Sequence, residues 1–292
     1  MRIQSFSANT ADCLNVAAIH FTAPTLLVGL SGAGKSQLLH YLHETCKLLL
    51  TNEPVSLPNG EYQLDFEHFG ISYQFAAFVE EKRLVKKKLT ANGEPVPLQS
   101  LKNKELGSHV LLAKNIAEIR HDSLRQLIVQ ADAEQLAEVK NLYCFIFQDI
   151  SDIRFEEMRF KEWESDWIGS DKLSDGMLKT FSYLTELITA PSGSILLIDE
   201  FENGLGLNCL SALLEEMLAR DDVQLILSSH HPYVINNVPT NCWRIISRKK
   251  GTVIARTAAE FGIGQTRYDA FFELMNNLYN EEENLDESLY TR

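Results

Sequence analysis

The sequence has no hydrophobic run of about 18 residues, the length that a membrane-spanning helix needs. Its first residues, Met1–Cys13, lack the apolar stretch of a secretory signal peptide. The five cysteines are odd in number, widely scattered and without a C-x-x-C pair, so neither a disulfide framework nor a zinc or redox centre is indicated. We expect a cytoplasmic protein without a membrane partner, whose reduced cysteines pack as small apolar groups.

Internal repeats and sustained apolar heptads are also missing, which argues against a solenoid and against a long coiled coil. Lysine and arginine number 27 against 40 aspartates and glutamates, a net charge of −13. This acidity disfavours nucleic-acid binding by the whole surface, although a local basic stripe can override it. With 292 residues and 45% hydrophobic composition, the chain suits one large α/β domain or two small ones.

The first hundred residues contain two kinds of hydrophobic pattern. A buried-strand run, Thr25–Val28, ends in glycine and precedes a helical pattern formed by Leu38, Leu42, Cys46 and Leu49. After a loop over Asn52–Gly60, apolar and polar residues alternate across 61–98 with turn residues between the runs. This alternation predicts an antiparallel meander.

The rest of the chain is mainly helical and then alternates between strands and helices. A helical pattern extends over 102–167 and is clearest at Asp122–Asn141. The elements expected next are a helix over Gly176–Ala190, a strand over Ser194–Ile198, a helix over Leu207–Arg220, a strand over Val223–Ser228, a hairpin across Lys250 and Gly251, and a last helix over Thr266–Asn280 before the acidic tail Glu281–Glu287. Such alternation predicts a parallel sheet.

The segment after the Thr25–Val28 strand matches G-x-x-x-x-G-K-S at every fixed position. Glycines let such a loop point successive backbone N–H groups at phosphate oxygens, and the following helix adds its positive end. Lys35 can reach the β- and γ-phosphates, and the Ser36 hydroxyl can ligate magnesium. We therefore predict that a nucleoside triphosphate binds to Gly29, Ser31, Gly32, Ala33, Gly34, Lys35 and Ser36.

A second acidic feature lies at the end of the strand Ser194–Ile198, where Asp199 and Glu200 follow. Without other motifs, two carboxylates after an apolar run are as often a solvated strand end as they are part of a nucleotide site. Downstream of a phosphate loop, Asp199 is expected to hold the magnesium ion, and Glu200 to polarise the water that attacks the γ-phosphate.

Two further motifs complete a series of four. Leu173–Met177 opens a predicted helix for which Ser174 or Asp175 is a natural N-cap, and His230 follows the strand ending at Ser228. In this order, the phosphate loop, the Leu-Ser-x-Gly signature, the Asp-Glu strand and the histidine resemble the ABC-type ATPases. The resemblance implies that Ser174 and Gly176 contact the γ-phosphate held by a second subunit. It also implies that His230 senses that phosphate from its own subunit.

The details resemble the soluble RecF/SMC/OLD-like branch, including small "ATP-binding protein" families of bacterial defence systems. Asp199–Leu205 is similar to their D-E-P-E-N-G-L, Ser229–Tyr233 to T-H-S-P-Y, and Leu173–Leu178 to L-S-D-G-T. Phe201 replaces the usual proline, Gly206-Leu207 the common His-Pro, and His231 the usual serine. Most of these positions are expected in the loop that faces a partner subunit. Gln74 and Gln148 both remain candidates for the family's Q-loop glutamine. A Toprim nuclease and long coiled coils have no counterpart in the sequence.

The predicted organisation is a single P-loop NTPase domain of ABC ATPase type, in the α/β class. Its nucleotide-binding core spans 1–60 and 190–260, an antiparallel β region 61–98, a helical region with the signature 99–189, and the last helix and acidic tail 261–292. Near the C-terminus, Tyr268, Phe271, Met275 and Leu278 form a stripe that serves either as core or as a docking face.

The resemblance implies an ATPase that binds ATP and Mg²⁺, converts ATP and water to ADP and phosphate, and dimerises around ATP. Its role is then that of a sensor or regulator for a separate effector protein, for example in anti-phage defence. The alternative is a RecF-like DNA clamp, with a basic run on the DNA backbone. That run comprises Lys82, Arg83, Lys86, Lys87 and Lys88, and it equally suits an exposed edge strand that uses lysine against aggregation.

Overall fold

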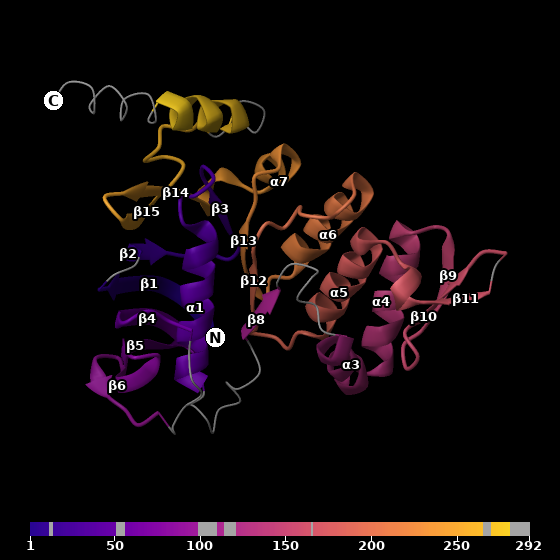
Figure 1. Ribbon diagram of the computed structural model, residues 1–292, viewed down its shortest axis with the longest axis horizontal. Helices are drawn as coiled ribbons and strands as arrows, with labels where there is room; N and C mark the ends of the chain where they lie inside the picture. The colour runs from indigo at the N-terminus through magenta and orange to yellow at the C-terminus, as the bar shows by residue number, and fades with distance from the viewer. Residues whose placement is uncertain are drawn as a thin grey trace. The chain divides into compact units, whose positions relative to one another are not determined.

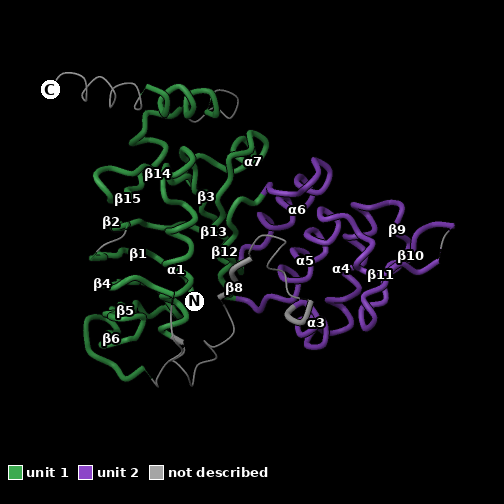
Figure 2. The backbone as a smooth tube through the Cα atoms, viewed as in Figure 1, with its two compact units in different colours: residues 1–112, 193–201, 222–292 green, residues 113–192, 202–221 purple. Residues whose placement is uncertain are grey.

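The computed structural model describes residues 1–11, 14–50, 56–98, 110–113, 121–164, 166–264 and 270–280. Within it the chain forms two compact units, coloured differently in Figure 2. Unit 1 comprises residues 1–112, 193–201 and 222–292, and unit 2 comprises residues 113–192 and 202–221. Unit 2 is therefore made of two segments that interrupt the chain of unit 1.

Unit 1 is organised around one large mixed sheet with the strand order β7-β6-β5-β4-β1-β2-β15-β14-β3-β13-β12-β8 (Figure 1). The strands at one end are β7 (Glu94–Pro95), β6 (Arg83–Ala91), β5 (Ile71–Glu80), β4 (Gly60–His68), β1 (Arg2–Thr10) and β2 (Asn15–His20), paired antiparallel throughout. These strands include the predicted meander over 61–98, and β1 joins it by pairing with β4.

The other end of the sheet is the parallel core. Here β3 (Thr25–Val28) lies between β14 (Trp243–Lys249) and β13 (Gln224–Ser228), and β13 pairs with β12 (Ile195–Ile198), all in parallel. The strand β15 (Thr252–Arg256) forms a hairpin with β14 across Lys250 and Gly251, as predicted, and runs parallel to β2. The short strand β8 (Val110–Ala113) lies at the edge beside β12.

Helix α1 (Lys35–Leu50) packs on the antiparallel strands through its apolar face. Leu38, Leu42 and Cys46 of this face are fully buried, as the helical spacing predicts. Tyr41 meets Tyr62 of β4 edge to face, with ring centroids 5.8 Å apart. This packing fixes the start of α1, and hence the loop that precedes it, relative to the sheet.

Unit 2 combines helices with a small separate sheet. Its helices are α3 (His121–Gln130), α4 (Ala133–Ile146), α5 (Asp175–Thr189) and α6 (Leu207–Ala219), and its three-stranded antiparallel sheet is formed by β9 (Ile150–Arg154), β10 (Arg159–Glu162) and β11 (Trp167–Gly169). Tyr143 of α4, Phe160 of β10 and Phe181 of α5 form an aromatic core with centroid distances of 5.1 to 5.6 Å.

The predicted helical stretch 102–167 is therefore only partly correct. Residues 121–130 and 133–146 are helical, but 150–154, 159–162 and 167–169 are strands, and 110–113 is a strand of the large sheet. Helical spacing of apolar residues misled the prediction here, because Ile150, Ile153 and Phe160 are buried by strand pairing and by the aromatic core. Residues 102–109 and 114–120 lie outside the described residues.

Smaller elements complete the fold. Helix α7 (Pro232–Asn237) follows β13, and short 3₁₀ turns, η3 (Ser170–Lys172) and η4 (Thr240–Cys242), precede α5 and β14. Residues 270–280 form a helix that buries Ala270, Leu274 and Leu278, so the buried stripe differs from the predicted one, whose Tyr268 is not among the described residues. None of the helices in the described ranges has the length and hydrophobicity that crossing a membrane requires.

A pocket around the phosphate loop

The loop between β3 and α1 is held against the neighbouring strand β14. Gly29 begins it with φ +146°, and a Cβ atom at this position would lie 2.2 Å from the carbonyl oxygen of Ile246. The backbone can approach β14 this closely only at glycine. Gly32 and Gly34 also adopt positive φ, so the loop turns back over the start of α1.

Lys35 is the first residue of α1, and its side chain folds back over the loop. Although it carries a charge, the residue is only 6% exposed. Its Nζ donates hydrogen bonds to the carbonyl oxygens of Gly29 at 2.8 Å and of Leu30 at 3.0 Å. The ammonium group therefore lies over the same loop whose glycines and helix start favour phosphate binding.

The two carboxylates after β12 are organised by a serine of the adjacent strand. The hydroxyl of Ser228 donates to Oδ1 of Asp199 at 2.5 Å and accepts from the backbone N–H of Glu200 at 2.8 Å. Glu200 adopts a left-handed conformation, with φ +48°. Since such a conformation is costly for a residue with a side chain, the hydrogen bond from its N–H helps to hold it.

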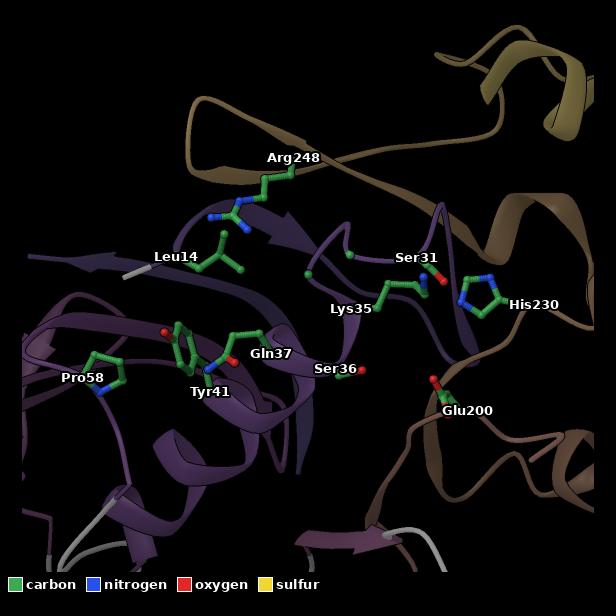
Figure 3. Close-up of a pocket in the computed structure, with 12 residues that line it drawn as sticks. Leu14, Ser31, Lys35, Ser36, Gln37, Tyr41, Pro58, Glu200, His230 and Arg248 are labelled. Carbon is green, nitrogen blue, oxygen red and sulfur yellow. The ribbon is translucent and has the colours of Figure 1, made fainter. Parts of the chain in front are cut away.

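These segments meet at one pocket of about 490 Å³, all of it in unit 1 (Figure 3). Of the residues predicted to form the site, seven line it: Ser31, Gly32, Gly34, Lys35, Ser36, Glu200 and His230. Gly29 and Ala33 shape the loop behind them, and Asp199 is tied to Glu200 through Ser228. Three stretches far apart in the sequence thus converge on one pocket.

The two histidines after β13 differ in their surroundings. His230 is exposed and lines the pocket. His231 is the N-cap of α7, where its Nδ1 accepts a hydrogen bond from the backbone N–H of Tyr233 at 3.2 Å. The side chain of His231 therefore stabilises a helix end, and of the two histidines it is His230 that lines the pocket.

The signature residues lie in unit 2, at the beginning of α5. Ser174 is the N-cap, and its hydroxyl accepts a hydrogen bond from the N–H of Met177 at 3.3 Å. A Cβ atom on Gly176 would lie 2.9 Å from the carbonyl oxygen of Gly204, in the turn that follows the Asp-Glu strand. Neither signature residue lines the pocket of unit 1.

The same turn is fastened to α5 by a buried lysine. Lys179 is fully buried, its Nζ donates to the carbonyl oxygen of Asn203, and it lies 5.2 Å from the ring centroid of Tyr183. Burying an ammonium group is costly unless it is hydrogen-bonded. Lys179 therefore ties the turn at residues 202–205 to the signature helix within unit 2.

Comparisons with known proteins agree with this arrangement. The family described as "AAA domain, putative AbiEii toxin, Type IV TA system" matches residues 152–236, which include the signature and the Asp-Glu strand. The SMC head domain from Thermotoga maritima superposes with a TM-score of 0.58 at 16% identity, over 88% of this chain and 99% of that one. An SMC head bound to the C-terminal winged-helix domain of ScpA gives a TM-score of 0.63 at 12% identity, over 88% and 98% of the two chains. A search of curated proteins finds no significant relative.

The chain has the fold of the SMC heads. The α/β class, with a parallel core, an antiparallel β region and a helical insertion, is confirmed by the strand pairing and by the likeness to SMC heads.

Five residues that line the pocket of this SMC-head-like fold were not predicted from the sequence: Leu14, Gln37, Tyr41, Pro58 and Arg248. Each has an ordinary sequence context, a strand start, a helix face, a loop or a hairpin, so no local signal distinguishes it. Neither candidate for the Q-loop glutamine lines the pocket. Gln74 is exposed on β5, and Gln148 lies in the turn after α4, where its carbonyl accepts a hydrogen bond from Trp163.

The predicted metal ligands suit magnesium bound together with a nucleotide. Ser36 offers a hydroxyl at the pocket, and Asp199 a carboxylate oriented by Ser228. Magnesium favours few protein oxygens with phosphate and water as the remaining ligands. The described residues contain no cluster of three or more histidine, cysteine, aspartate or glutamate side chains that could hold a metal ion.

The five basic residues between positions 82 and 88 do not form one continuous surface, because the geometry of β6 places them differently. Lys86 and Lys88 pair across from Phe78 and Ala76 of β5, and these four side chains line a shallow pocket of about 190 Å³ on the sheet. Lys82 lies in the turn before β6 with φ +59°, and Arg83 begins the strand. Lys87 is one residue out of phase with Lys86 and Lys88, so it points to the opposite side of β6.

Proposed function

We propose that this protein is an ATPase that binds Mg-ATP in the pocket of unit 1 and hydrolyses it to ADP and phosphate. The observation that carries the proposal is the convergence of Lys35, Glu200 and His230 on one pocket from three separate segments. A phosphate-binding loop alone would suit any nucleotide-binding protein. A carboxylate and a histidine beside it add the groups that hydrolysis requires.

Each residue has a defined part in this reaction. The loop N–H groups and Lys35 bind the triphosphate. Ser36 and Asp199 would hold the magnesium ion, which when bound would neutralise charge on the phosphates. Glu200 orients and polarises the water that attacks the γ-phosphorus, while the bond to the bridging oxygen of ADP breaks. His230 contacts the γ-phosphate, and this contact is lost when the phosphate leaves.

We further propose that two copies enclose two ATP molecules, with Ser174 and Gly176 of one copy facing the loop of the other. Support comes from the position of Ser174 at the start of the 15-residue helix α5, where backbone N–H groups and the helix dipole favour an anion. ATP then clamps the dimer, because only the γ-phosphate is contacted by both copies. Hydrolysis releases it.

The dimer is proposed to act in the cytoplasm as a sensor or regulator of a separate effector protein, for example in anti-phage defence. The matching family is described by a toxin and a toxin–antitoxin system, and one similar SMC head is bound to a domain of another protein. Isolating the Glu200→Gln protein from its own host with Mg-ATP tests this role. A stoichiometric second protein in the trapped particle supports it, and a bare dimer carrying DNA contradicts it.

The proposed dimer, in which two copies enclose ATP, is tested by measuring the molecular mass of the protein in solution. Glu200→Gln should bind ATP but not hydrolyse it, so that light scattering detects a dimer in saturating Mg-ATP and a monomer without nucleotide. Glu215→Gln, which changes an exposed carboxylate of α6, should behave as the wild type. A Glu200→Gln protein that binds ATP and stays monomeric would rule out the sandwich dimer.

A DNA clamp is the second candidate, and the pocket between Lys86, Lys88 and Phe78 favours it. Duplex DNA should then stimulate hydrolysis, with a steep decline as salt increases. The double variant Lys86→Ala/Lys88→Ala should lose that stimulation, whereas Lys140→Ala in unit 2 should retain it. Hydrolysis that ignores DNA at low salt would favour the sensor instead.

A further inference from the structure

The pocket of unit 1 has two chemically different ends (Figure 3). One end carries the phosphate loop, Ser36, Glu200 and His230, all polar groups suited to the triphosphate and its magnesium. The other end is lined by Leu14, Tyr41, Pro58 and Arg248, which combine apolar surface with one guanidinium group. If the triphosphate occupies the first end, the nucleoside extends toward the second.

The hairpin of β14 and β15 brings Arg248 to this second end. Arg248 pairs with Val253 across the hairpin, and the N–H of Asn15 donates to the carbonyl oxygen of Gly251 at 3.1 Å, which docks the hairpin against the start of β2. Leu14 is consequently beside the hairpin, and Figure 3 shows the Arg248 side chain extending toward it.

The side chains of Leu14 and Arg248 differ in their exposure and in their contacts. Leu14 is 9% exposed and so is held in place by packing, whereas the side chain of Arg248 is exposed and forms no hydrogen bond or ion pair with another described residue. A planar guanidinium group stacks well on an aromatic face, and an aliphatic side chain gives apolar contact to such a ring. Among the described residues that line this end, the aromatic one is Tyr41, which is only 1% exposed and packs on Tyr62.

We propose that Arg248 binds the nucleobase by stacking its guanidinium group on the ring, with Leu14 as the apolar wall of the same subsite. The inference rests on the proposed binding of a nucleoside triphosphate in this pocket. Stacking uses the π face that every base has and not its hydrogen-bonding edge. The subsite therefore holds purine nucleotides with little distinction between adenine and guanine, and holds the smaller pyrimidines less well.

Inorganic tripolyphosphate separates this role from a general attraction for phosphate, because it lacks the nucleoside. Calorimetry with magnesium should give a Kd for ATP that rises between about 3-fold and 30-fold in Arg248→Ala, with the Kd for tripolyphosphate changed less than about twofold. Lys249→Ala removes a neighbouring exposed charge of the same hairpin and should change neither constant. Arg248→Lys keeps the charge but loses the planar group, so it should resemble Arg248→Ala.

Each other result overturns the proposal. Equal losses of affinity for ATP and tripolyphosphate would assign Arg248 to the phosphates, and unchanged affinity for ATP would assign it no contact. Full rescue by Arg248→Lys would show that charge and not stacking matters. Wild-type protein that binds neither ligand would instead contradict the proposed nucleotide-binding function, which keeps the two failures distinguishable.

Discussion

The phosphate loop of unit 1 and the signature helix of unit 2 begin in similar ways but depend on different parts of the molecule. Each has a helix start, with Lys35 opening α1 and Ser174 capping α5. The loop is shaped by contacts with a distant strand, since Gly29 lies against Ile246. The cap of α5 is local, a hydrogen bond between residues three apart.

The two halves of the proposed site therefore depend on different contacts. The geometry of the loop depends on packing between β3 and β14, and its pocket gathers residues from several segments of unit 1. The signature depends on one helix end, supported by the turn that Lys179 fastens to α5. Substitutions should therefore disturb the two halves through different quantities: folding and nucleotide affinity in unit 1, association in unit 2.

The largest effect is expected from Gly29→Ala, which tests the non-local character of the loop. The new methyl group would collide with the backbone of Ile246 at φ +146°, so the free energy of unfolding should fall by about 4 kcal/mol. Gly32→Ala is the matched control, since φ is +79° but no atom lies within 4 Å of its Cβ, and it should cost about 1 kcal/mol. Urea unfolding measures both, and equal losses would contradict the packing argument.

Lys35→Ala tests the chemical role of the loop separately from its shape. Without the ammonium group, the Kd for Mg-ATP should rise at least about 100-fold, because a charged hydrogen-bond donor to the triphosphate is lost. Calorimetry provides the measurement. Lys47→Ala removes a lysine from the last turn of the same helix, where it pairs with Glu44 at 3.5 Å, and should leave the Kd unchanged. An unaffected Kd in Lys35→Ala would assign ATP to another site.

Glu186 tests the stability of the signature helix. Desolvation by burial raises the pKa of this carboxyl from 4.5 to about 7. Between these values the folded protein holds a proton that the unfolded chain has released, so this group makes folding less favourable as the pH rises. Glu186→Gln should therefore be more stable than the wild type by about 2 kcal/mol at pH 8, and by much less near pH 4.5.

The measurement is the free energy of unfolding in urea at both pH values, compared between the two proteins. Glu215→Gln serves as the control, because this glutamate of the neighbouring helix α6 is exposed and should give no such pH-dependent gain. A Glu186→Gln gain that is equal at both pH values would contradict the raised pKa as its cause.

The smallest change in stability is expected for Ser174→Ala, which sharpens the distinction between capping and nucleotide contact. Loss of an N-cap costs about 1 kcal/mol of unfolding free energy. Asp132→Ala removes the N-cap of α4, whose side chain accepts from the N–H of Gln135 at 2.8 Å, and should cost a similar amount. In the Glu200→Gln background, light scattering with Mg-ATP should detect a dimer in Asp132→Ala but not in Ser174→Ala. Dimers in both would leave Ser174 as a cap only.

Local patterns predicted most elements of unit 1, because each depends on short-range constraints. The strand Thr25–Val28 has the predicted bounds, and the alternation of Tyr62, Leu64 and Phe66 matches their burial on one side of β4. The pattern was misleading at Ile150, Ile153 and Phe160, where strands form instead of a helix. There the aromatic core with Tyr143 and Phe181 decides the structure, and such contacts leave no trace in spacing.

The sequence by itself determined the phosphate loop, the Asp-Glu strand and the order of the four motifs, because each consists of adjacent residues with fixed chemical requirements. Only the tertiary structure decided that Ser228 orients Asp199 and Glu200, and that Leu14 and Arg248 line the far end of the pocket. Leu14 and Arg248 are 234 positions apart in the chain and meet through the hairpin beside β2. Sheet order, set by the burial of many side chains at once, places them together, and no local pattern encodes that order.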